Sequence, residues 1–475
     1  MQDFIKSIVG TGNTILWSYV LIGLLIVLGL YFTIRSRGVQ FRLLPDMIRL
    51  LTENSSNKSK KGVSSFQAFC ISTASRVGTG NLAGVAIAIA TGGPGSVFWM
   101  WIIALIGAGS SFVESTLAQI YKIKDGDSYR GGPAYYMEKA LNARWLGLIF
   151  SVLITLCFGL VFNAVQSNTI AAAFHEAFGL DTLHVGIILG IFTLIIIFGG
   201  VHRIAKFTEI VVPIMAVAYV CVAIFVIAKN ASMIPSIFSL IVSNAFGIRP
   251  IAGATLATII TQGIKRGLFS NEAGMGSAPN AAATAEVSHP VKQGLIQTLG
   301  VFTDTMLICS STAFLILISG VYTQSDMTGI ELTQRALSSQ VGPWGNIFIA
   351  ACILLFAFSS IIGNYYYGET NIEFMNTNKL ILFVYRFSVV GMVIWGATSK
   401  IQIVWDLADL FMGSMALINL IVIAILSKFA FAALKDYQKQ KKAGLDPVFK
   451  ASSIEGLKNT ECWNDDSNET YKNIS

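Results

Sequence analysis

Apolar residues occur along the chain in long runs that are separated by short polar segments. A run of about 20 apolar residues crosses the hydrocarbon core of a bilayer as an α-helix, because each residue adds ~1.5 Å. On this scale the sequence predicts an all-α integral membrane protein with 11 transmembrane helices. Their ranges are 14–34, 65–91, 95–121, 145–175, 184–200, 206–228, 251–288, 293–320, 345–375, 379–397 and 402–428. Amphipathic stretches near 234–246 and 328–340 predict short surface helices.

Two of the runs contain glycines and polar residues at mid-length, which disfavour a continuous helix. The first run reads VGTGN at 77–81, and the second reads FSNEAGMG at 269–276. As one helix, the second run would be about 57 Å long, far more than a membrane requires. Backbone groups freed at membrane depth are tolerated where they face protein or a water-filled cavity. Close helix packing through small residues also explains the first interruption taken alone.

The two interruptions occupy corresponding positions, each in the first helix of a block of five, 65–228 and 251–428. Five helices per block make the second block enter the membrane from the opposite side. Interrupted helices that correspond in two inverted repeats indicate a transporter site at the midplane. The inner half of the first helix ends in free carbonyls near Ala74–Val77, which suit a cation. Its outer half begins near Asn81 with free N–H groups, which suit a carboxylate.

Charge supports the membrane assignment and predicts its orientation. Hydrophobic residues make up 54% of the 475 residues and charged residues only 12%, against about 25% charged in soluble domains. Loops on one side hold 21 Lys and Arg residues and loops on the other side hold 5. The positive-inside rule therefore places the protein in the cell (inner) membrane with the N-terminus outside and the C-terminus in the cytoplasm. The net charge of +7 is assigned to the membrane surface, and nucleic acid is not expected as a partner.

The helix pattern divides the chain into four parts. Residues 1–62 form an extra transmembrane helix with a cytoplasmic loop, 63–230 and 231–430 form the two five-helix repeats, and 431–475 form a polar cytoplasmic tail. After Lys442 the sequence loses periodicity, so we expect a loose tail without a role in transport.

Known catalytic and metal-binding patterns do not occur in the sequence. The six cysteines are scattered singly, and the four histidines fall at predicted membrane edges. There is no HExxH or GxSxG motif. We therefore expect neither an enzyme, an organic cofactor nor a required protein partner. A channel is also disfavoured, because channels use rings of carbonyls or charges from symmetric subunits.

Five stretches resemble the alanine or glycine:cation symporter family. They are GGPGSVFWMW (92–101, with Gly107 beyond it), VGTGNLAGVA (77–86), RGGPAYYM (130–137), KRGLFSNEAGMGSAPNAAATA (265–285) and GNYYYGE (363–369). Ser96 departs from the family, which more usually has Gly or Ala there. The resemblance implies a LeuT-type fold with a 5+5 inverted repeat, preceded here by one extra helix. It also implies symport of L-alanine, D-alanine or glycine with Na⁺, or occasionally H⁺, through the lipid bilayer.

The candidate substrate-binding residues belong to both interruptions and to one further helix. They are Gly78, Thr79, Gly80, Asn81, Gln166, Asn271, Gly274 and Gly276. The position of Gln166 is implied by the resemblance; a lone amide in a membrane helix otherwise commonly bonds a neighbouring helix.

The candidate sodium ligands are hard oxygen donors: the hydroxyls of Ser359 and Ser360 and the carbonyls of Ala74, Val77 and Phe356. Serines in membrane helices also bond their own i−4 carbonyl. Ser270 and Asp304 are candidates for a second cation, and Asp304 alternatively holds the pocket in shape. Glu272 is expected to be structural and to pair with Lys265, Arg266 or Arg76, because an unpaired charge at that depth is costly. A proton-coupled carrier of the same fold is the rival, and it would use Glu272, Asp304 or Glu114.

Overall fold

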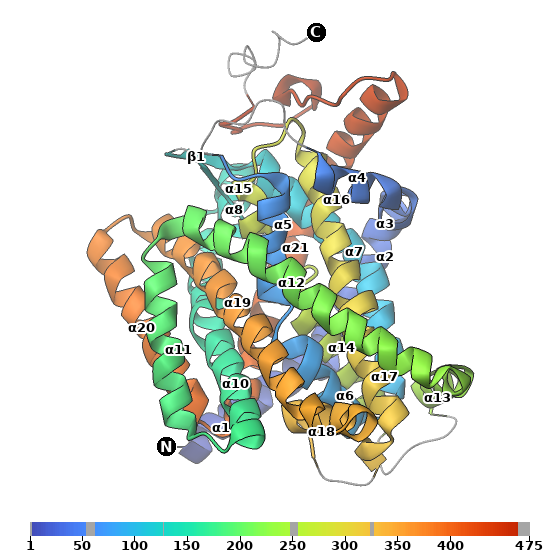
Figure 1. Ribbon diagram of the computed structural model, residues 1–475. Coiled ribbons are helices and arrows are strands. Elements are labelled where there is room, and N and C mark those ends of the chain that lie inside the picture. Colours follow the sequence, from blue (N-terminus) through green and yellow to red (C-terminus); the bar gives the residue numbers. More distant parts are fainter. Residues whose placement is uncertain (1, 54–61, 127, 248–254, 324–326, 464–475) are drawn as a thin grey trace.

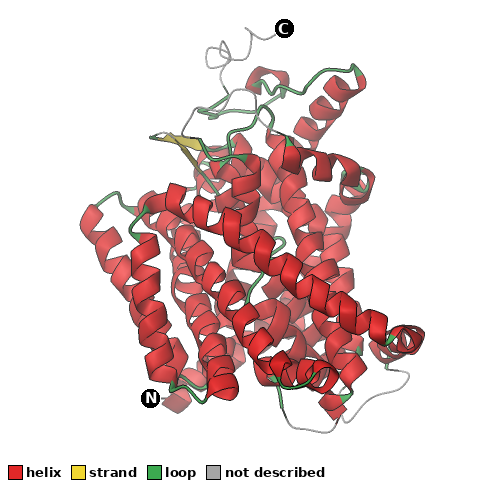
Figure 2. Cartoon of the chain, viewed as in Figure 1, coloured by secondary structure: helices red, strands yellow, loops and turns green. Residues whose placement is uncertain are grey.

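The computed structural model describes residues 2–53, 62–126, 128–247, 255–323 and 327–463, most of which are helical (Figure 1; Figure 2). Most helices run between two ends of the molecule, called upper and lower here as they stand in Figure 1. An antiparallel hairpin of β1 (Ile123–Asp125) and β2 (Ser128–Arg130) lies at the upper end and pairs Ile123 with Arg130.

Within the described residues, eight helical segments are long and apolar enough to cross a membrane by length and composition. They comprise α1 (Gln2–Thr14) with η1 (Ile15–Leu21) and α2 (Ile22–Arg35), α7 (Gly95–Ile120), α9 (Arg144–Ile154) with η3 (Thr155–Phe162) and α10 (Asn163–Phe178), α12 (Gly200–Lys229), α16 (Pro290–Val301) with η5 (Phe302–Cys309) and α17 (Ser310–Ser319), α19 (Trp344–Met375), α20 (Lys379–Thr398) and α21 (Ile401–Lys442). The segments η1, η3 and η5 are π-helical turns within otherwise continuous helices.

Shorter helices complete the bundle and cover its two ends. They are α3 (Val39–Arg42), α4 (Leu44–Thr52), α8 (Pro133–Leu141), α11 (Thr182–Ile197), α13 (Ile234–Ala245) and α18 (Gly329–Val341), with 3₁₀ turns at Ala231–Met233, Val321–Thr323 and Ala451–Ser453. The helices α13 and α18 lie across the lower end (Figure 1) and confirm the short helices expected near 234–246 and 328–340.

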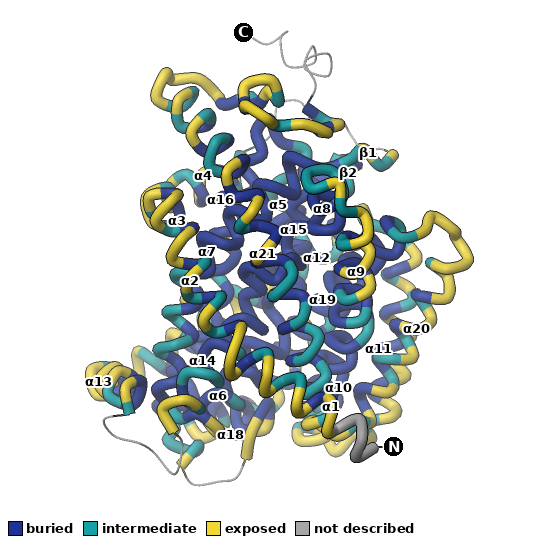
Figure 3. Tube along the Cα trace, turned by 180° about the vertical axis from the view of Figure 1, so that it is seen from behind, coloured by how far each residue is buried: buried dark blue, intermediate teal, exposed yellow. Residues whose placement is uncertain are grey.

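The bundle exposes apolar side chains and buries polar ones, which is the reverse of a soluble protein. Ile191 and Ile195 on α11 and Ile214 and Phe225 on α12 are all more than half exposed. Figure 3 shows that the elements inside the bundle are buried along most of their length. Such an exposed apolar belt requires a lipid environment.

Both expected helix interruptions are present. The helix α5 (Ser65–Arg76) begins with a capping box between Ser64 and Gln67 and ends at Val77; the chain becomes helical again at η2 (Gly80–Gly84) and α6 (Val85–Gly92). The helix α14 (Leu256–Asn271) ends where Glu272 takes φ +59°. The chain then passes through two glycines of positive φ before α15 (Ala278–Thr284) begins. We call residues 77–79 the first break and residues 272–277 the second break.

The expected loose tail is wrong for the described residues beyond the last spanning helix. The helix α21 continues through the expected boundary at residue 431 as far as Lys442, because Ala433 and Tyr437 face the protein and are buried. The chain then crosses the upper end, where Phe449 is fully buried and Trp463 is 4% exposed. Residues 464–475 lie outside the described part.

Candidate binding site at the two helix breaks

Amide oxygens from two elements occupy the free N–H groups of the first break. The Gly78 N–H donates to Oδ1 of Asn81 (2.9 Å), and the N–H and hydroxyl of Thr79 both donate to Oε1 of Gln166 on α10 (2.9 and 2.7 Å). All four residues are buried. The break therefore binds oxygen acceptors through its peptide groups, as expected for the exposed N-terminal end of a half-helix. Gln166, which was expected to contact substrate, contacts this break.

Four of the five expected sodium ligands meet beside the same break. The hydroxyl oxygen of Ser360 lies 2.8 Å from the Ala74 carbonyl oxygen, 3.4 Å from that of Val77 and 3.0 Å from that of Phe356. A hydroxyl has one proton to donate, so it cannot satisfy three carbonyls at once. This set consists only of neutral oxygens, and such hard donors suit a monovalent cation.

The hydroxyl of Ser359 faces another neighbour. It lies 2.8 Å from the Phe356 carbonyl oxygen and 3.7 Å from the Met215 sulfur on α12. Its hydrogen bonds among the described residues therefore do not reach the carbonyls of α5. Adjacent positions on a helix point about 100° apart, so only one of the two serines faces α5.

Gly78 separates the oxygen set of Ser360 from the amide oxygen of Gln166. A Cβ at Gly78 would lie 2.8 Å from Oε1 of Gln166 and closer still to Oγ of Ser360. These two oxygens are therefore less than about 6 Å apart. Because Gly78 has no side chain, the hydroxyl oxygen of Ser360 and the amide oxygen of Gln166, which accepts from the Thr79 N–H, lie close together in one buried place.

Asp304 of η5 connects residues that adjoin the two breaks. Its carboxylate accepts hydrogen bonds from Asn81 Nδ2 (2.6 Å), Ser270 Oγ (2.8 Å) and Thr305 Oγ1 (2.9 Å), and it is fully buried. No ion pair involves it within the described ranges. A Cβ at Gly80 would lie 3.1 Å from the Ser270 Cα, so the two helices touch here. The predicted pair of Ser270 and Asp304 is thus in direct contact.

The glycines of the second break face away from this centre. The N–H groups of Gly274 and Gly276 donate to the two carboxylate oxygens of Glu114 on α7, at 3.0 and 3.1 Å. Asn419 of α21 donates to Glu114 (2.8 Å) and to the Gly274 carbonyl (2.9 Å). Gly274 and Gly276 were expected to contact substrate, but their peptide groups already hold a carboxylate of the protein.

Asn271 lies between the hydrogen bonds around Asp304 and the second break. Its Nδ2 donates to Thr305 Oγ1 (3.2 Å), next to Asp304, and its Oδ1 accepts from the Ala273 N–H (3.0 Å). Asn271 therefore both contacts the Asp304 cluster and shapes the second break.

Of the three cations expected to pair with Glu272, Lys265 and Arg266 bind elsewhere, and Arg76 is the one whose charge acts on Glu272. Glu272 accepts hydrogen bonds from Ser75 (2.7 Å) and Ser277 (2.6 Å). The two cations instead face α21, where Lys265 and Arg266 lie 3.1 and 2.5 Å from Asp409. They precede the break by more than one helical turn, so their side chains are directed toward the lower end and cannot reach a residue beyond it.

Three aromatic rings lie next to the breaks and were not expected from the sequence. Phe269 packs between Phe162 and Trp405, with both ring centroids 4.6 Å away, and the Arg266 guanidinium lies 4.6 Å from the Trp405 ring centroid. Together with the Arg266–Asp409 pair, these rings lie on the lower side of the breaks. Phe269 could have been found from the sequence, because it lies within one helical turn of a glycine-rich interruption. Phe162 and Trp405 could not, because they come from helices that are distant in sequence.

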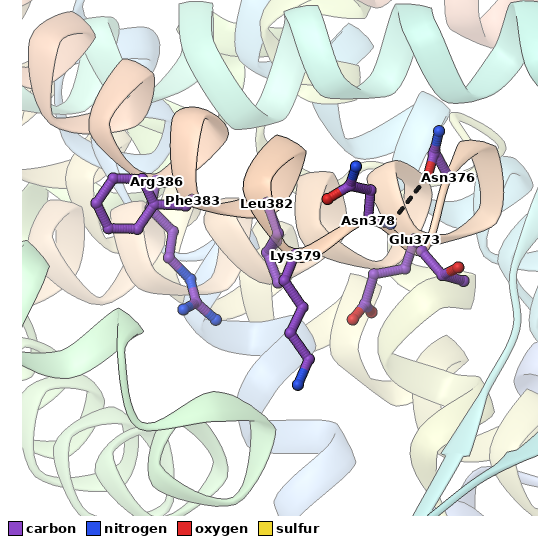
Figure 4. Close-up of a pocket in the computed structure, with 8 residues that line it drawn as sticks. Glu373, Asn376, Asn378, Lys379, Leu382, Phe383 and Arg386 are labelled. Atoms are coloured by element: carbon purple, nitrogen blue, oxygen red, sulfur yellow. Dashed lines mark hydrogen bonds between the residues drawn. The ribbon is translucent and has the colours of Figure 1, made fainter.

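A surface pocket at the turn between α19 and α20 is separate from this site (Figure 4). Its lining includes Glu373, Lys379 and Arg386. Glu373 follows Ser360 on α19 by more than three helical turns, so the pocket lies at the upper end of the molecule and not at the breaks.

Residues 2–451 match the sodium:alanine symporter family. The chain belongs to that family. It is 58% identical over 463 residues to the probable sodium/glutamine symporter GlnT of Bacillus subtilis, covering 98% of this chain and 97% of the relative. It is 37% identical to the sodium/alanine symporter AgcS of Methanococcus maripaludis (93% and 99%). It is 39% identical to the sodium/proton-dependent alanine carrier protein of Bacillus sp. PS3 (88% and 97%).

A solved structure shares the fold of the transporter. A mutant of the Eremococcus coleocola manganese transporter superimposes with a TM-score of 0.51 at 15% identity, covering 86% of this chain and 84% of that one. Family membership and fold together establish a multi-pass membrane transporter of the amino-acid symporter class, which is not an enzyme class.

Proposed function

We propose that the protein imports a small neutral amino acid together with Na⁺ by alternating access. The observation that carries this proposal is the first break, where peptide N–H groups that suit a carboxylate lie within about 6 Å of the oxygen set around Ser360. A zwitterion and a cation would fit there side by side.

We further propose eleven membrane crossings, arranged as one extra N-terminal helix and two inverted five-helix repeats of the LeuT type. The chain offers three crossings besides the eight long segments: α5 with η2 and α6, α11, and α14 with α15. The surplus of Lys and Arg on one side supports a cytoplasmic upper end and an outward-facing lower end in the cell membrane.

The substrate carboxylate would replace the amide oxygens on the N–H groups of Gly78 and Thr79, at the positive end of η2 and α6. Na⁺ would lie among the carbonyl oxygens of Ala74, Val77 and Phe356, and the Ser360 hydroxyl would keep its proton, turn it away from these carbonyls and offer its oxygen to the ion. Two opposite charges ~6 Å apart attract by about 3 kcal/mol at an effective dielectric constant of ~20. This attraction would couple the two binding events by roughly a hundredfold.

Alanine and glycine are our first candidates for the substrate, because the rings of Phe162, Phe269 and Trp405 leave little room beside the breaks. Glutamine is the second candidate, and the 58% identity to a probable sodium/glutamine symporter favours it. The amide side chain of glutamine would need polar partners. Asn271 and Thr305, which lie beside Asp304, are our candidate partners.

Proton coupling is the rival mechanism, and the name of the Bacillus sp. PS3 relative includes both ions. We favour Na⁺ because the set around Ser360 contains only neutral oxygens. The carboxylate of Asp304, held by Ser270, is our candidate for a second cation.

Uptake into proteoliposomes tests the proposal. A Na⁺ gradient without a pH gradient is expected to drive accumulation of labelled alanine, and unlabelled glycine and glutamine are competed against it. Accumulation that follows a pH gradient and ignores Na⁺ would refute sodium coupling. Absence of Na⁺-driven uptake of labelled alanine and glycine, with Na⁺-driven uptake of labelled glutamine, would replace the first substrate candidate by the second.

A further inference from the structure

The segment that follows α21 is bound to the upper end of the molecule at several points. We call residues 444–463 the C-terminal clasp (Figure 1). Two of its aromatic side chains are buried: Phe449 is fully buried and packs against His289 and Trp463, with ring centroids 5.2 and 5.3 Å away. Burial of these rings, in a segment with little helix of its own, provides most of the apolar contribution to docking.

Hydrogen bonds attach the clasp to three other parts of the transporter. The Trp463 indole N–H donates to the Gln119 carbonyl (2.9 Å) at the end of α7, and the Asn459 amide donates to the Lys139 carbonyl (2.9 Å) on α8. The Phe449 N–H donates to the Ser288 carbonyl (2.9 Å), between α15 and α16. The clasp thus links elements that are far apart in sequence.

The residues under the clasp hold the end of α15. The amide of Gln119 and the ammonium of Lys122 both donate to the Ala285 carbonyl, at 3.0 and 2.9 Å. Ala285 also forms a parallel bridge with Val63, and the Glu286 N–H donates to the Val63 carbonyl (3.1 Å). Val63 lies immediately before α5, so one short main-chain pairing connects the upper ends of α5 and α15.

These two half-helices are the parts of the bundle best placed to move. Each is separated from the rest of its helix by a break. A break can act as a hinge because its residues after the first, such as Gly78, Thr79, Gly274 and Gly276, donate to side chains and do not form the i→i−4 bonds that make a helix rigid. A path from the breaks to the upper end requires α5 and α15 to separate at Val63 and Ala285. The clasp bonds Gln119, whose amide holds Ala285, and Ser288, which lies three residues beyond Ala285.

We propose that the C-terminal clasp holds α5 and α15 together at the cytoplasmic end, and that its release accompanies opening of the site to the cytoplasm. This inference rests on the proposed alternating-access function and on the proposed orientation. In this conformation the clasp closes the cytoplasmic side, so it would slow the inward opening step and prevent leakage of Na⁺ through an empty carrier.

Site-resolved cysteine labelling tests the clasp without requiring transport. Thr284→Cys places a thiol at the last residue of α15, where the native side chain is buried and bonds only within its own helix among the described residues. The full-length protein, reconstituted in liposomes, is treated with a membrane-impermeant maleimide that has access to the upper end. Mass spectrometry then follows modification of the introduced thiol separately from the native cysteines.

Two pairs of variants, each made in the Thr284→Cys background, separate the clasp from general perturbation. A variant that ends at Lys442 is compared with one that ends at Trp463. Trp463→Ala is compared with Leu445→Ala, since Leu445 belongs to the clasp but is 60% exposed. In the variant ending at Lys442 and in Trp463→Ala, we expect the introduced thiol to be labelled at least tenfold faster than in the Thr284→Cys protein with an unaltered clasp. In both controls we expect it to be labelled at the same rate as in that protein. Trp463→Phe, which keeps a ring but loses the N–H, is expected to be intermediate.

Unchanged labelling in Trp463→Ala, in protein that elutes as a single species and is stabilised by Na⁺ as the wild type is, would overturn the clasp. If the variant ending at Lys442 does not fold, the point variants decide. Failure of the symport proposal can be distinguished from failure of the clasp proposal. A wild-type protein without Na⁺-driven uptake refutes the symport proposal, whatever the labelling rates are. Normal wild-type uptake with no effect of the clasp variants on labelling refutes the clasp alone.

Discussion

Ser360→Ala is the sharpest test of the cation site. The hydroxyl oxygen lies 2.8 Å from the Ala74 carbonyl and 3.0 Å from the Phe356 carbonyl, and its removal leaves buried carbonyls without that partner. A hydrogen bond or ligand contact to a charged species contributes about 1.5–3 kcal/mol. The affinity for Na⁺ should therefore fall roughly ten- to hundredfold.

The assay is the Na⁺ dependence of labelled amino-acid uptake into proteoliposomes. The Na⁺ concentration for half-maximal uptake is expected to rise roughly ten- to hundredfold, with maximal uptake at saturating Na⁺ largely retained. Thermodynamic linkage requires a second effect. At a fixed, sub-saturating Na⁺ concentration, Na⁺ should tighten amino-acid binding to the purified variant less than to the wild type, and saturating Na⁺ should restore the full factor.

Ser359→Ala is the matched control, because it removes the same atom one position earlier on α19. Its hydroxyl bonds the Phe356 carbonyl and approaches the Met215 sulfur, so its loss is expected to change Na⁺ affinity little. Equal losses in the two variants, or an unchanged Na⁺ dependence in Ser360→Ala, would refute the oxygen set described here.

Three further predictions follow from the site and the clasp. Gly78→Ala places a Cβ against Oε1 of Gln166 and Oγ of Ser360 and should weaken both ligands roughly ten- to hundredfold, whereas Gly391→Ala meets nothing within 4 Å and should leave transport rates unchanged. Asp304→Asn replaces an acceptor of three hydrogen bonds; it should lower the Hill coefficient for Na⁺ in uptake assays, and a raised amino-acid KM with an unchanged Hill coefficient would restrict Asp304 to shaping the pocket. Burial lowers the pKa of Lys122 to about 8, against the opposing charges of Cys462 and Glu286, and the rings of Tyr129 and Trp463 offset only part of that cost. The docked clasp disfavours the charged amine, so docking strengthens as pH rises from about 8 toward the ordinary lysine pKa of 10.5. Labelling of the thiol introduced by Thr284→Cys, relative to the variant ending at Lys442, should slow between about pH 8 and pH 10 when Lys122 is present and should not do so in Lys122→Met.

Hydropathy and glycine placement were sufficient to predict a mostly helical membrane protein and both breaks. Each spanning helix requires an apolar run of a certain length, and each break requires residues that leave helical geometry at low cost, so both are properties of a local stretch of sequence. The contacts of Ser360 with Ala74 and Val77 were predictable for a related reason. In the expected inverted arrangement the two helices meet at mid-membrane, and the resemblance to known symporters provided their register.

The direction of peptide groups in the second break was not predictable. Gly274 and Gly276 have φ of +84° and +85°. Glycine can adopt many backbone conformations, so its presence in the sequence does not fix the direction of the neighbouring peptide groups. Their partner, Glu114, lies about 160 residues earlier in the chain, and no local pattern connects them. The clasp was missed for a similar reason: Phe449 and Trp463 are isolated aromatics in a polar segment, and burial without helical or strand periodicity leaves no regular signal.

The two breaks differ in what occupies their peptide N–H groups, and this difference assigns them different roles. At the first break the acceptors are the neutral amides of Asn81 and Gln166, which a substrate carboxylate can replace with a gain in electrostatic energy. At the second break the acceptor is the buried carboxylate of Glu114, which Asn419 also holds. Exchanging one carboxylate for another there would gain nothing and would leave Glu114 buried without its partners. One transported carboxylate per cycle, bound at the first break, is therefore what this arrangement of ligands favours.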